Sequence, residues 1–197
     1  MNEKELVQKA QSGDFEAFSQ LIEKYKTKIY NLALKLSKNR QDAEDVLQET
    51  FLKAVDNIDK FRGESAFGTW LYTIAVNIMR AQYAKDQKAE LRPIEEYLPE
   101  AHGDDSLHIE LFDWGNPQEL MERKELKSAI DLALEEMPQT YSLPFILRYF
   151  EDMQVSEIAS VLKLSVPAAK SRILRARLAL RERLSELFRE KIDERVQ

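Results

Sequence analysis

A run of basic side chains near the C-terminus is the feature of this sequence most suited to chemistry. The cations of the segment SVPAAKSRILRARLALRER are Lys170, Arg172, Arg175, Arg177, Arg181 and Arg183. Glu182 is the only acid among them, although the whole chain carries a formal net charge of -6. Such a run either binds phosphates and guanine edges of a nucleic acid or forms the solvated face of a helix. Its selective placement in an acidic protein favours the first interpretation.

The residues in front of this run predict a helix-turn-helix motif over Val155 to Leu174. VSEIASVL has apolar residues at helical spacing, KLS supplies a turn, and Ser165 is a natural N-cap for a second helix with Pro167 in its first turn. In this motif the second helix enters the major groove, and its first residues face the bases. We expect DNA contacts from Ala168, Lys170, Ser171, Arg172, Leu174, Arg175 and Arg177.

A single helix-turn-helix on an anionic chain is expected to bind DNA weakly. One bidentate base contact discriminates by about 1–3 kcal/mol, and phosphate contacts lose strength as salt is added. The protein therefore either dimerises or binds DNA together with a larger partner. The sequence has no heptad pattern sustained over several repeats, which favours the larger partner.

The rest of the chain predicts an all-α fold of two helical domains. Helix-forming residues dominate, and 5 Gly and 6 Pro are too few for a sandwich or a barrel. Helical patterns that start at Asp14, near Asp42 and at Ser65 fill a first domain, residues 1–92. In the second pattern the expected buried stripe is Val46, Leu47, Phe51, Leu52, Val55 and Ile58. Residues 93–117 contain no Lys or Arg, which is typical of a flexible acidic linker, and helical periodicity resumes over 118–197.

Several other classes of protein are excluded. There is no cysteine, so the chain offers no thiolate metal site and no cysteine nucleophile. Asp42, Asp45 and Glu49 share a helix face, but a di-iron site also needs histidines on facing helices, and His102 and His108 both lie in the linker. No phosphate-binding glycine loop, signal peptide or membrane-spanning run is present. We expect no enzyme activity, no metal, no cofactor and no insertion into a membrane, and thus an intracellular protein.

Two segments of the first domain carry a resemblance to a known family. DAEDVLQETFLKAVDNI and FRGESAFGTWLYTIAVN, followed by the helix-turn-helix, resemble the extracytoplasmic-function (ECF) sigma factors of bacterial RNA polymerase, most closely the envelope-stress, RpoE-like type. The resemblance implies that residues 1–92 are sigma domain 2, which binds core polymerase and recognises and melts the promoter -10 element. Residues 118–197 would be sigma domain 4, which recognises the -35 element. The chain would then act in the bacterial cytoplasm as an alternative sigma factor for promoter-specific transcription initiation.

The resemblance also implies which residues have these roles. The surface for core polymerase would comprise Asp45, Gln48, Glu49 and Leu52. The same spacing is typical of an ordinary acidic helix face, so both interpretations stay open. The -10 element would be contacted by Phe61, Arg62, Gly63, Glu64, Ser65, Asn77 and Arg80. A base is extruded there, and Phe61 can stack on it while Asn77 reads its edge. Core packing is the other interpretation of Phe61, and for Trp70 it is the one we favour.

Partners and departures from the family pattern complete the expectations. Most members are held inactive by an anti-sigma protein, often anchored in a membrane, and the resemblance implies such a partner here. The linker would either mimic nucleic acid in a basic channel of polymerase or act only as a spacer. Lys163 and Pro167 stand where the family usually has glycine. Pro144 falls where the family has a continuous helix, and this proline should kink or restart that helix. An operator-binding helix-turn-helix regulator, usually a dimer, is the alternative. The sequence leaves the promoter consensus, the activating signal and the closed or extended arrangement of the domains open.

Overall fold

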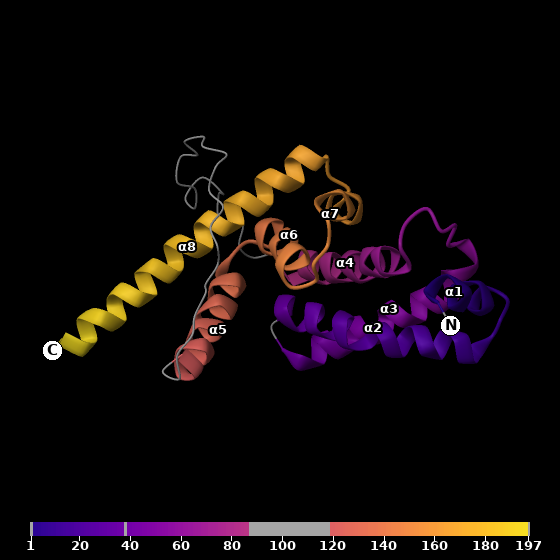
Figure 1. Cartoon of the computed structure of the whole chain (residues 1–197), viewed down its shortest axis with the longest axis horizontal. Helices are drawn as coiled ribbons and strands as arrows, with labels where there is room; N and C mark the ends of the chain where they lie inside the picture. The colour runs from indigo at the N-terminus through magenta and orange to yellow at the C-terminus, as the bar shows by residue number, and fades with distance from the viewer. Residues whose placement is uncertain (1, 38, 87–118, 197) are drawn as a thin grey trace.

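The computed structural model describes residues 2–37, 39–86 and 119–196, and every regular element in these ranges is a helix. The elements are α1 (Glu3–Gln11), α2 (Phe15–Leu36), α3 (Arg40–Asn57), the 3-10 helix η1 (Ile58–Lys60), α4 (Phe67–Asp86), α5 (Glu119–Glu136), α6 (Gln139–Tyr149), α7 (Val155–Leu162) and α8 (Val166–Val196). The all-α fold expected from the sequence is confirmed. The predicted linker, with both its boundaries and both histidines, lies outside the described residues. Figure 1 shows α1–α4 on one side of the molecule, α5 and α8 extending toward the other, and α7 beside α4.

Side-chain caps explain where the first helices begin. The Asn2 side chain accepts a hydrogen bond from the third amide of α1, 2.8 Å away, in a capping box with Glu5. Asp14 accepts from the Ala17 amide at 3.1 Å, which confirms it as the N-cap of α2. Asn39 caps α3 in the same way at 2.8 Å. Each cap satisfies an amide that has no partner inside its own helix.

The buried stripe of α3 differs from the expected one. Its inward residues are Ala43, Val46, Thr50 and Ala54, followed by Ile58 of η1. Thr50 tolerates burial because its hydroxyl donates to the Val46 carbonyl oxygen at 2.6 Å. These side chains are mostly small, so α2 can pack close to α3. Leu52 and Val55, which we expected inside, are 66% and 50% exposed, because they lie outside this narrow stripe.

Close approach of α4 to α2 fixes the position of α4. A Cβ atom on Gly68 would lie 2.9 Å from Cε1 of Tyr25, closer than side-chain atoms normally pack. Tyr25 is itself held, because its hydroxyl donates to Glu3 at 2.7 Å and its ring packs 5.7 Å from that of Phe67. Only glycine at position 68 lets α4 lie this near to α2 without moving the ring.

The second helical group contains the helix-turn-helix. Pro144 lies inside α6, which is neither broken nor restarted there. Proline removes only the hydrogen bond to the carbonyl of Thr140, an exposed residue whose carbonyl can bind water. Lys163 ends α7 with φ 55° and ψ 49°, the left-handed conformation that glycine adopts without strain. Ser165 accepts a hydrogen bond from the Ala168 amide at 3.3 Å, which confirms it as the N-cap of α8.

The two helical groups pack against each other in a closed arrangement, a point that the sequence left open. Within the described residues, three side-chain hydrogen bonds connect α4 to the second group: Thr69 Oγ1 to Glu157 Oε1 at 2.9 Å, the Tyr72 hydroxyl to the Glu151 carboxylate, and Arg80 Nη1 to the Leu162 carbonyl oxygen at 3.3 Å. From α2, Lys35 forms an ion pair with Asp131 at 3.0 Å and lies 3.9 Å from the centre of the Phe150 ring.

We predict that Gly68→Ala lowers the free energy of unfolding by about 1–3 kcal/mol. The gain in helix propensity, about 1 kcal/mol, is outweighed because the new methyl group meets a ring that cannot swing away. Thermal or urea unfolding measures the change. In a Tyr25→Leu background the same substitution should cost less than in the wild type. Equal costs in the two backgrounds would show that the ring is not the obstacle.

Candidate nucleic-acid interface

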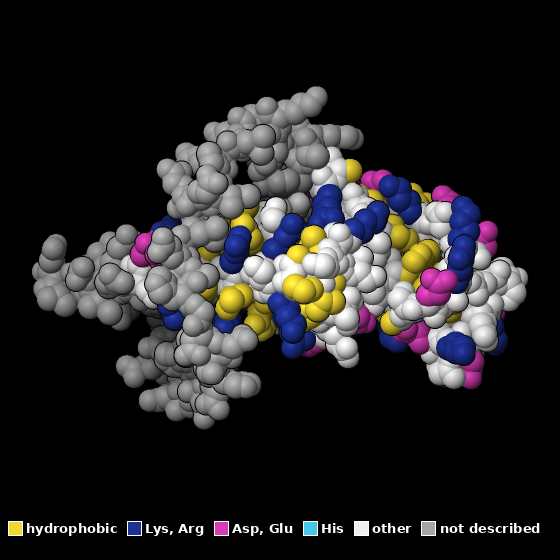
Figure 2. Space-filling model, turned by 90° about the horizontal axis from the view of Figure 1, so that it is seen from above, with side chains coloured by type: hydrophobic (Ala, Val, Ile, Leu, Met, Phe, Trp, Pro, Cys, Tyr) yellow, Lys and Arg dark blue, Asp and Glu magenta, His cyan; other side chains and the backbone are white. Residues whose placement is uncertain are grey.

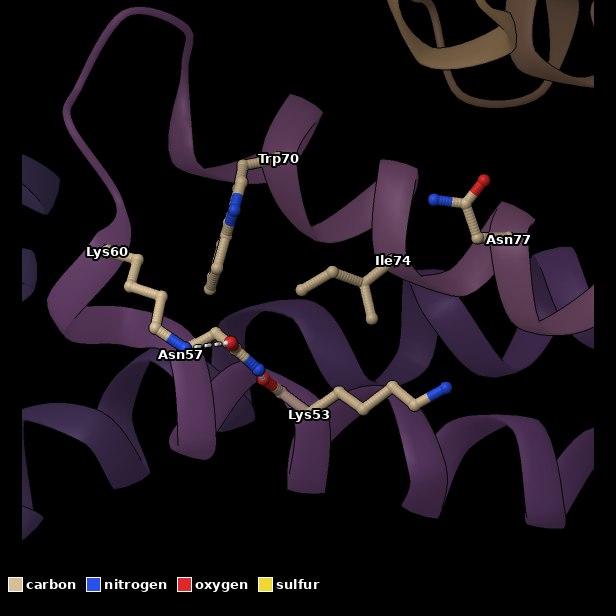
Figure 3. Close-up of a pocket in the computed structure, with 6 residues that line it drawn as sticks. All are labelled: Lys53, Asn57, Lys60, Trp70, Ile74 and Asn77. Carbon is tan, nitrogen blue, oxygen red and sulfur yellow. Dashed lines mark hydrogen bonds between the residues drawn. The ribbon is translucent and has the colours of Figure 1, made fainter.

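A pocket of about 370 Å³ lies between the end of α3 and the exposed side of α4. Its lining residues are Lys53, Asn57, Lys60, Trp70, Ile74 and Asn77. The first three come from α3 and η1 and the last three from α4. Figure 3 shows Trp70 and Ile74 extending toward Asn57 and Lys53, with Asn77 at the far end of the α4 stripe. Each set has the spacing i, i+4, i+7, which places its members on one face of a helix. The pocket is therefore formed by two facing helical stripes.

Hydrogen bonds fix the cationic wall of this pocket. Asn57 Nδ2 donates to the Lys53 carbonyl oxygen at 2.8 Å, and Asn57 Oδ1 accepts from Lys60 Nζ at 2.9 Å. The Lys53 ammonium forms an ion pair with Glu49 at 2.7 Å. Lys60 has no carboxylate partner among the described residues. The wall therefore presents a positive charge and hydrogen-bond donors, which suit a phosphate or the acceptor atoms of a base edge.

Aromatic packing forms the other side of the pocket. Trp70 lines it, and the centre of the Trp70 ring lies 5.2 Å from that of Phe61 and 5.5 Å from that of Phe67. Phe61 is partly buried in this cluster and does not line the pocket, as expected if it is a packing residue. Trp70 has both roles, because its ring packs on Phe61 and also bounds the cavity. An aromatic wall of this kind can stack on a nucleobase.

The expected -10 residues are not all brought together. Asn77 is exposed at the pocket, and Arg62, Gly63, Glu64 and Ser65 form an exposed loop between η1 and α4. Gly63 has a φ of +72°, a conformation that glycine adopts without strain. Arg80 points elsewhere, since it donates to the Leu162 carbonyl oxygen at the contact with α7. Burial there and the neighbouring Arg172 lower the pKa of Arg80.

Three residues of the pocket were missed by the sequence interpretation, namely Lys53, Asn57 and Lys60. A signal for them existed, because they repeat the i, i+4, i+7 spacing of Trp70, Ile74 and Asn77. Only the packing of α3 against α4 shows that the two stripes face each other.

The second helix of the helix-turn-helix, α8, presents part of the expected DNA-contacting set to solvent. Lys170, Ser171, Leu174 and Arg175 are exposed, whereas Ala169, Ile173, Ala176 and Leu180 form the buried stripe on the other side. Ala168, Arg172 and Arg177 lie between the two faces. Figure 2, which views the molecule from above, shows Lys and Arg side chains interspersed with hydrophobic ones on this side. The exposed set fits a helix that inserts into a groove of DNA.

Arg177 is only partly exposed. Its Nε atom is buried and has no hydrogen-bond partner within the described part of the chain. The sequence contained the reason, because Arg177 follows Ile173 by four residues and precedes Leu180 by three, so it borders the buried stripe.

The expected polymerase-binding residues lie together on the outer side of α3. Asp45, Gln48 and Leu52 are exposed, and Glu49 is partly so. Leu52 and Val55 add exposed apolar surface to this otherwise polar helix. Apolar side chains rimmed by polar ones are typical of a surface that binds another protein.

Two further features of the described residues bear on function. Among the described residues, no group of three or more His, Cys, Asp or Glu side chains is placed to hold a metal ion. None of the described helices combines the length and the apolar character that crossing a membrane requires.

The sequence of this chain matches a known protein family in both helical groups. Residues 21–89 match the model for Sigma-70 region 2, and residues 127–180 match that for Sigma-70, region 4. The chain is 34% identical over 194 residues to the RNA polymerase sigma-H factor of Pseudomonas aeruginosa, covering 95% of this chain and 96% of that protein. It is also 34% identical over 188 residues to the ECF RNA polymerase sigma-E factor of Escherichia coli K12, covering 93% and 95%.

Solved structures agree with this assignment. CnrH, solved in complex with the cytosolic domain of CnrY, matches with a TM-score of 0.67 and 26% identity, over 93% of this chain and 97% of that one. The sigma factor RpoE of Bartonella quintana, solved with the anti-sigma factor NepR, shares the fold with a TM-score of 0.61 at 22% identity, over 85% and 96%. From the two matched regions and the full-length relatives, the chain belongs to the ECF group of the sigma-70 family, the alternative sigma factors that direct transcription initiation by RNA polymerase.

Proposed function

We propose that this sigma factor divides its work between its two helical groups. The first group, α1–α4, binds core polymerase through the outer face of α3 and captures an unpaired base of the -10 element. The second group, α5–α8, reads the -35 element through the exposed face of α8. In this proposal the chain acts in the bacterial cytoplasm and catalyses no covalent step, since the chemistry belongs to polymerase.

The observation that carries the proposal is the pocket between α3 and α4. Extruding a base from duplex DNA costs a few kcal/mol, so the protein must return comparable stabilisation. Stacking on an aromatic side chain contributes about 1–3 kcal/mol per base. Trp70, Lys60 and Asn77 line one open pocket, and so can offer stacking and edge hydrogen bonds together. These side chains can therefore offset the cost of extrusion.

The proposal gives Arg80 a role that depends on the arrangement of the two helical groups. In the closed arrangement its guanidinium donates to Leu162 of the helix-turn-helix and is half-buried. Separation of α4 and α7 would release the Arg80 guanidinium from this hydrogen bond and leave it free for a promoter phosphate. We therefore propose that the form bound to polymerase and promoter is open at this contact.

An anti-sigma partner also belongs to the proposal. CnrH was solved with the cytosolic domain of CnrY, and CnrH is similar to this chain over nearly its whole length. By analogy, we propose that a dedicated protein binds this sigma factor when it is not engaged with polymerase. Its absence from a native pull-down of unstressed cells would count against this part of the proposal.

We predict that Asn77→Ala weakens capture of the -10 strand by about tenfold, the equivalent of one lost base-edge contact. The probe is a promoter that the holoenzyme selects from a library randomised at the -10 and -35 elements, and the assay measures open-complex formation. Binding to core polymerase should not change. Asn31→Ala, an exposed asparagine on α2, is the matched control. Equal losses in the two variants would remove Asn77 from the interface.

We predict that Leu52→Glu abolishes co-elution with core polymerase in size-exclusion chromatography. The substitution places a charge in the most exposed apolar position of α3, where burial against a partner would be costly. Leu34→Glu is the matched control, since Leu34 is a leucine of α2 that is 37% exposed. Persistent co-elution of the Leu52 variant would show that this face of α3 does not bind polymerase.

We predict that Arg175→Ala reduces transcription from the selected promoter by about 5- to 150-fold at limiting holoenzyme, the range for one bidentate base contact. Binding to core polymerase should be retained. Arg181→Ala tests the same charge change at another exposed position, six residues further along α8. An equal loss in the Arg181 variant would mean that the basic run binds phosphates diffusely and does not read bases.

A further inference from the structure

One residue that touches neither the pocket nor the exposed loop holds both in place. Gln11, the last residue of α1, donates from Nε2 to the Ile58 carbonyl oxygen at 2.9 Å and to the Phe61 carbonyl oxygen at 2.7 Å. The Ile58 carbonyl also accepts from the Phe61 amide at 3.1 Å, which closes the single turn of η1. The two N–H groups of one amide therefore bind both ends of this turn.

The turn needs such support because its own hydrogen bonds are few. A 3-10 helix has poorer hydrogen-bond geometry than an α-helix, and η1 is only three residues long. It follows the C-terminal end of α3, where carbonyl groups have no partner within the helix. The exposed residues 62–66 come directly after it. Gln11 is a long-range partner for the turn, being 47 and 50 residues away in the sequence.

Both sides of the pocket depend on this turn. Lys60 belongs to η1 and forms part of the cationic wall. Phe61 follows η1, and its ring packs against that of Trp70, the aromatic wall, with 5.2 Å between the ring centres. A shift of the turn would therefore move the Lys60 ammonium and also remove the part of the Trp70 ring's support that Phe61 provides.

Gln11 itself is held by the packing of α1. Leu6, Val7 and Ala10 are buried, so the end of the helix cannot drift away from the turn. Gln11 is partly buried, whereas Gln8, one turn earlier on the same helix, is exposed. The position of the Gln11 side chain is thus set by the core of the first helical group.

We propose that Gln11 is a positioning residue for base capture, which acts by fixing the turn 58–61 and through it the Lys60 and Trp70 walls of the pocket. The inference rests on the proposed function of that pocket. It assigns a role in promoter melting to α1, a helix that contributes no residue to the pocket.

The test combines Gln11→Met, which keeps the length of the side chain and removes both donors, with single abasic sites in DNA. Holoenzyme containing the full chain is bound to fork templates of the selected promoter, in which each nucleotide of the unpaired -10 strand is made abasic in turn. In the wild type, the abasic position that weakens binding most marks the captured base. On the intact fork, Gln11→Met should bind roughly five- to tenfold more weakly than the wild type. On the fork that lacks the captured base, the two should bind equally.

The matched control for Gln11→Met is a second glutamine of α1, Gln8. Gln8→Met makes the same change on the exposed side of α1 and should behave as the wild type on every template. The ratio of intact to abasic binding is taken within each protein, so a smaller folded fraction cancels. If Gln11→Met folds too poorly to assay, Gln11→Asn takes its place in the test, because its side chain is shorter and reaches less far toward the two carbonyl groups.

If the Gln11 variant loses the same factor on the abasic fork as on the intact one, Gln11 does not act through base capture and the inference fails alone. If no abasic position weakens binding by the wild type, no base is captured, and the proposed function of the pocket fails together with the inference.

Discussion

The packing of α4 against α2 and α3 determines the rest of the first helical group. Gly68 lets α4 lie against the Tyr25 ring, and Leu71, Ala75 and Val76 then fill the interior. Because one face of α4 is fixed inward in this way, the Trp70, Ile74 and Asn77 stripe must face the end of α3. The pocket is therefore a consequence of core packing, because the residues that stabilise the domain also fix the direction of the residues that line the pocket.

Much of this architecture could be predicted from the sequence, and the limits have physical causes. Helical periodicity and capping residues such as Asp14 and Ser165 locate helices, because these signals are local. The helix-turn-helix was predicted for the same reason. Periodicity misjudged the buried face of α3, where Ala43 and Ala54 lie inside and Val55 outside. Apolar character alone does not distinguish a core position from a binding surface.

Features that depend on the contact between distant helices could not be predicted. The Lys53, Asn57 and Lys60 stripe becomes a pocket wall only where α4 crosses it, and the sequence does not give the crossing. Arg80 was expected to face DNA and instead lies against Leu162, because the two helical groups meet there. The partial burial of Arg177 has a local cause, since its place beside Ile173 and Leu180 could be seen in the spacing.

The contacts between the two helical groups include an ion pair and side-chain hydrogen bonds, and these have a consequence for how the closed arrangement responds to its surroundings. The Lys35–Asp131 ion pair and the hydrogen bonds from Thr69 and Tyr72 can be replaced by water and ions when the groups part. Each contributes only about 1 kcal/mol net. Salt screens this partly exposed ion pair, whereas the apolar packing inside each group is insensitive to it. A higher ionic strength therefore weakens the contact between the two groups and shifts the balance from closed toward open molecules, while each group stays folded.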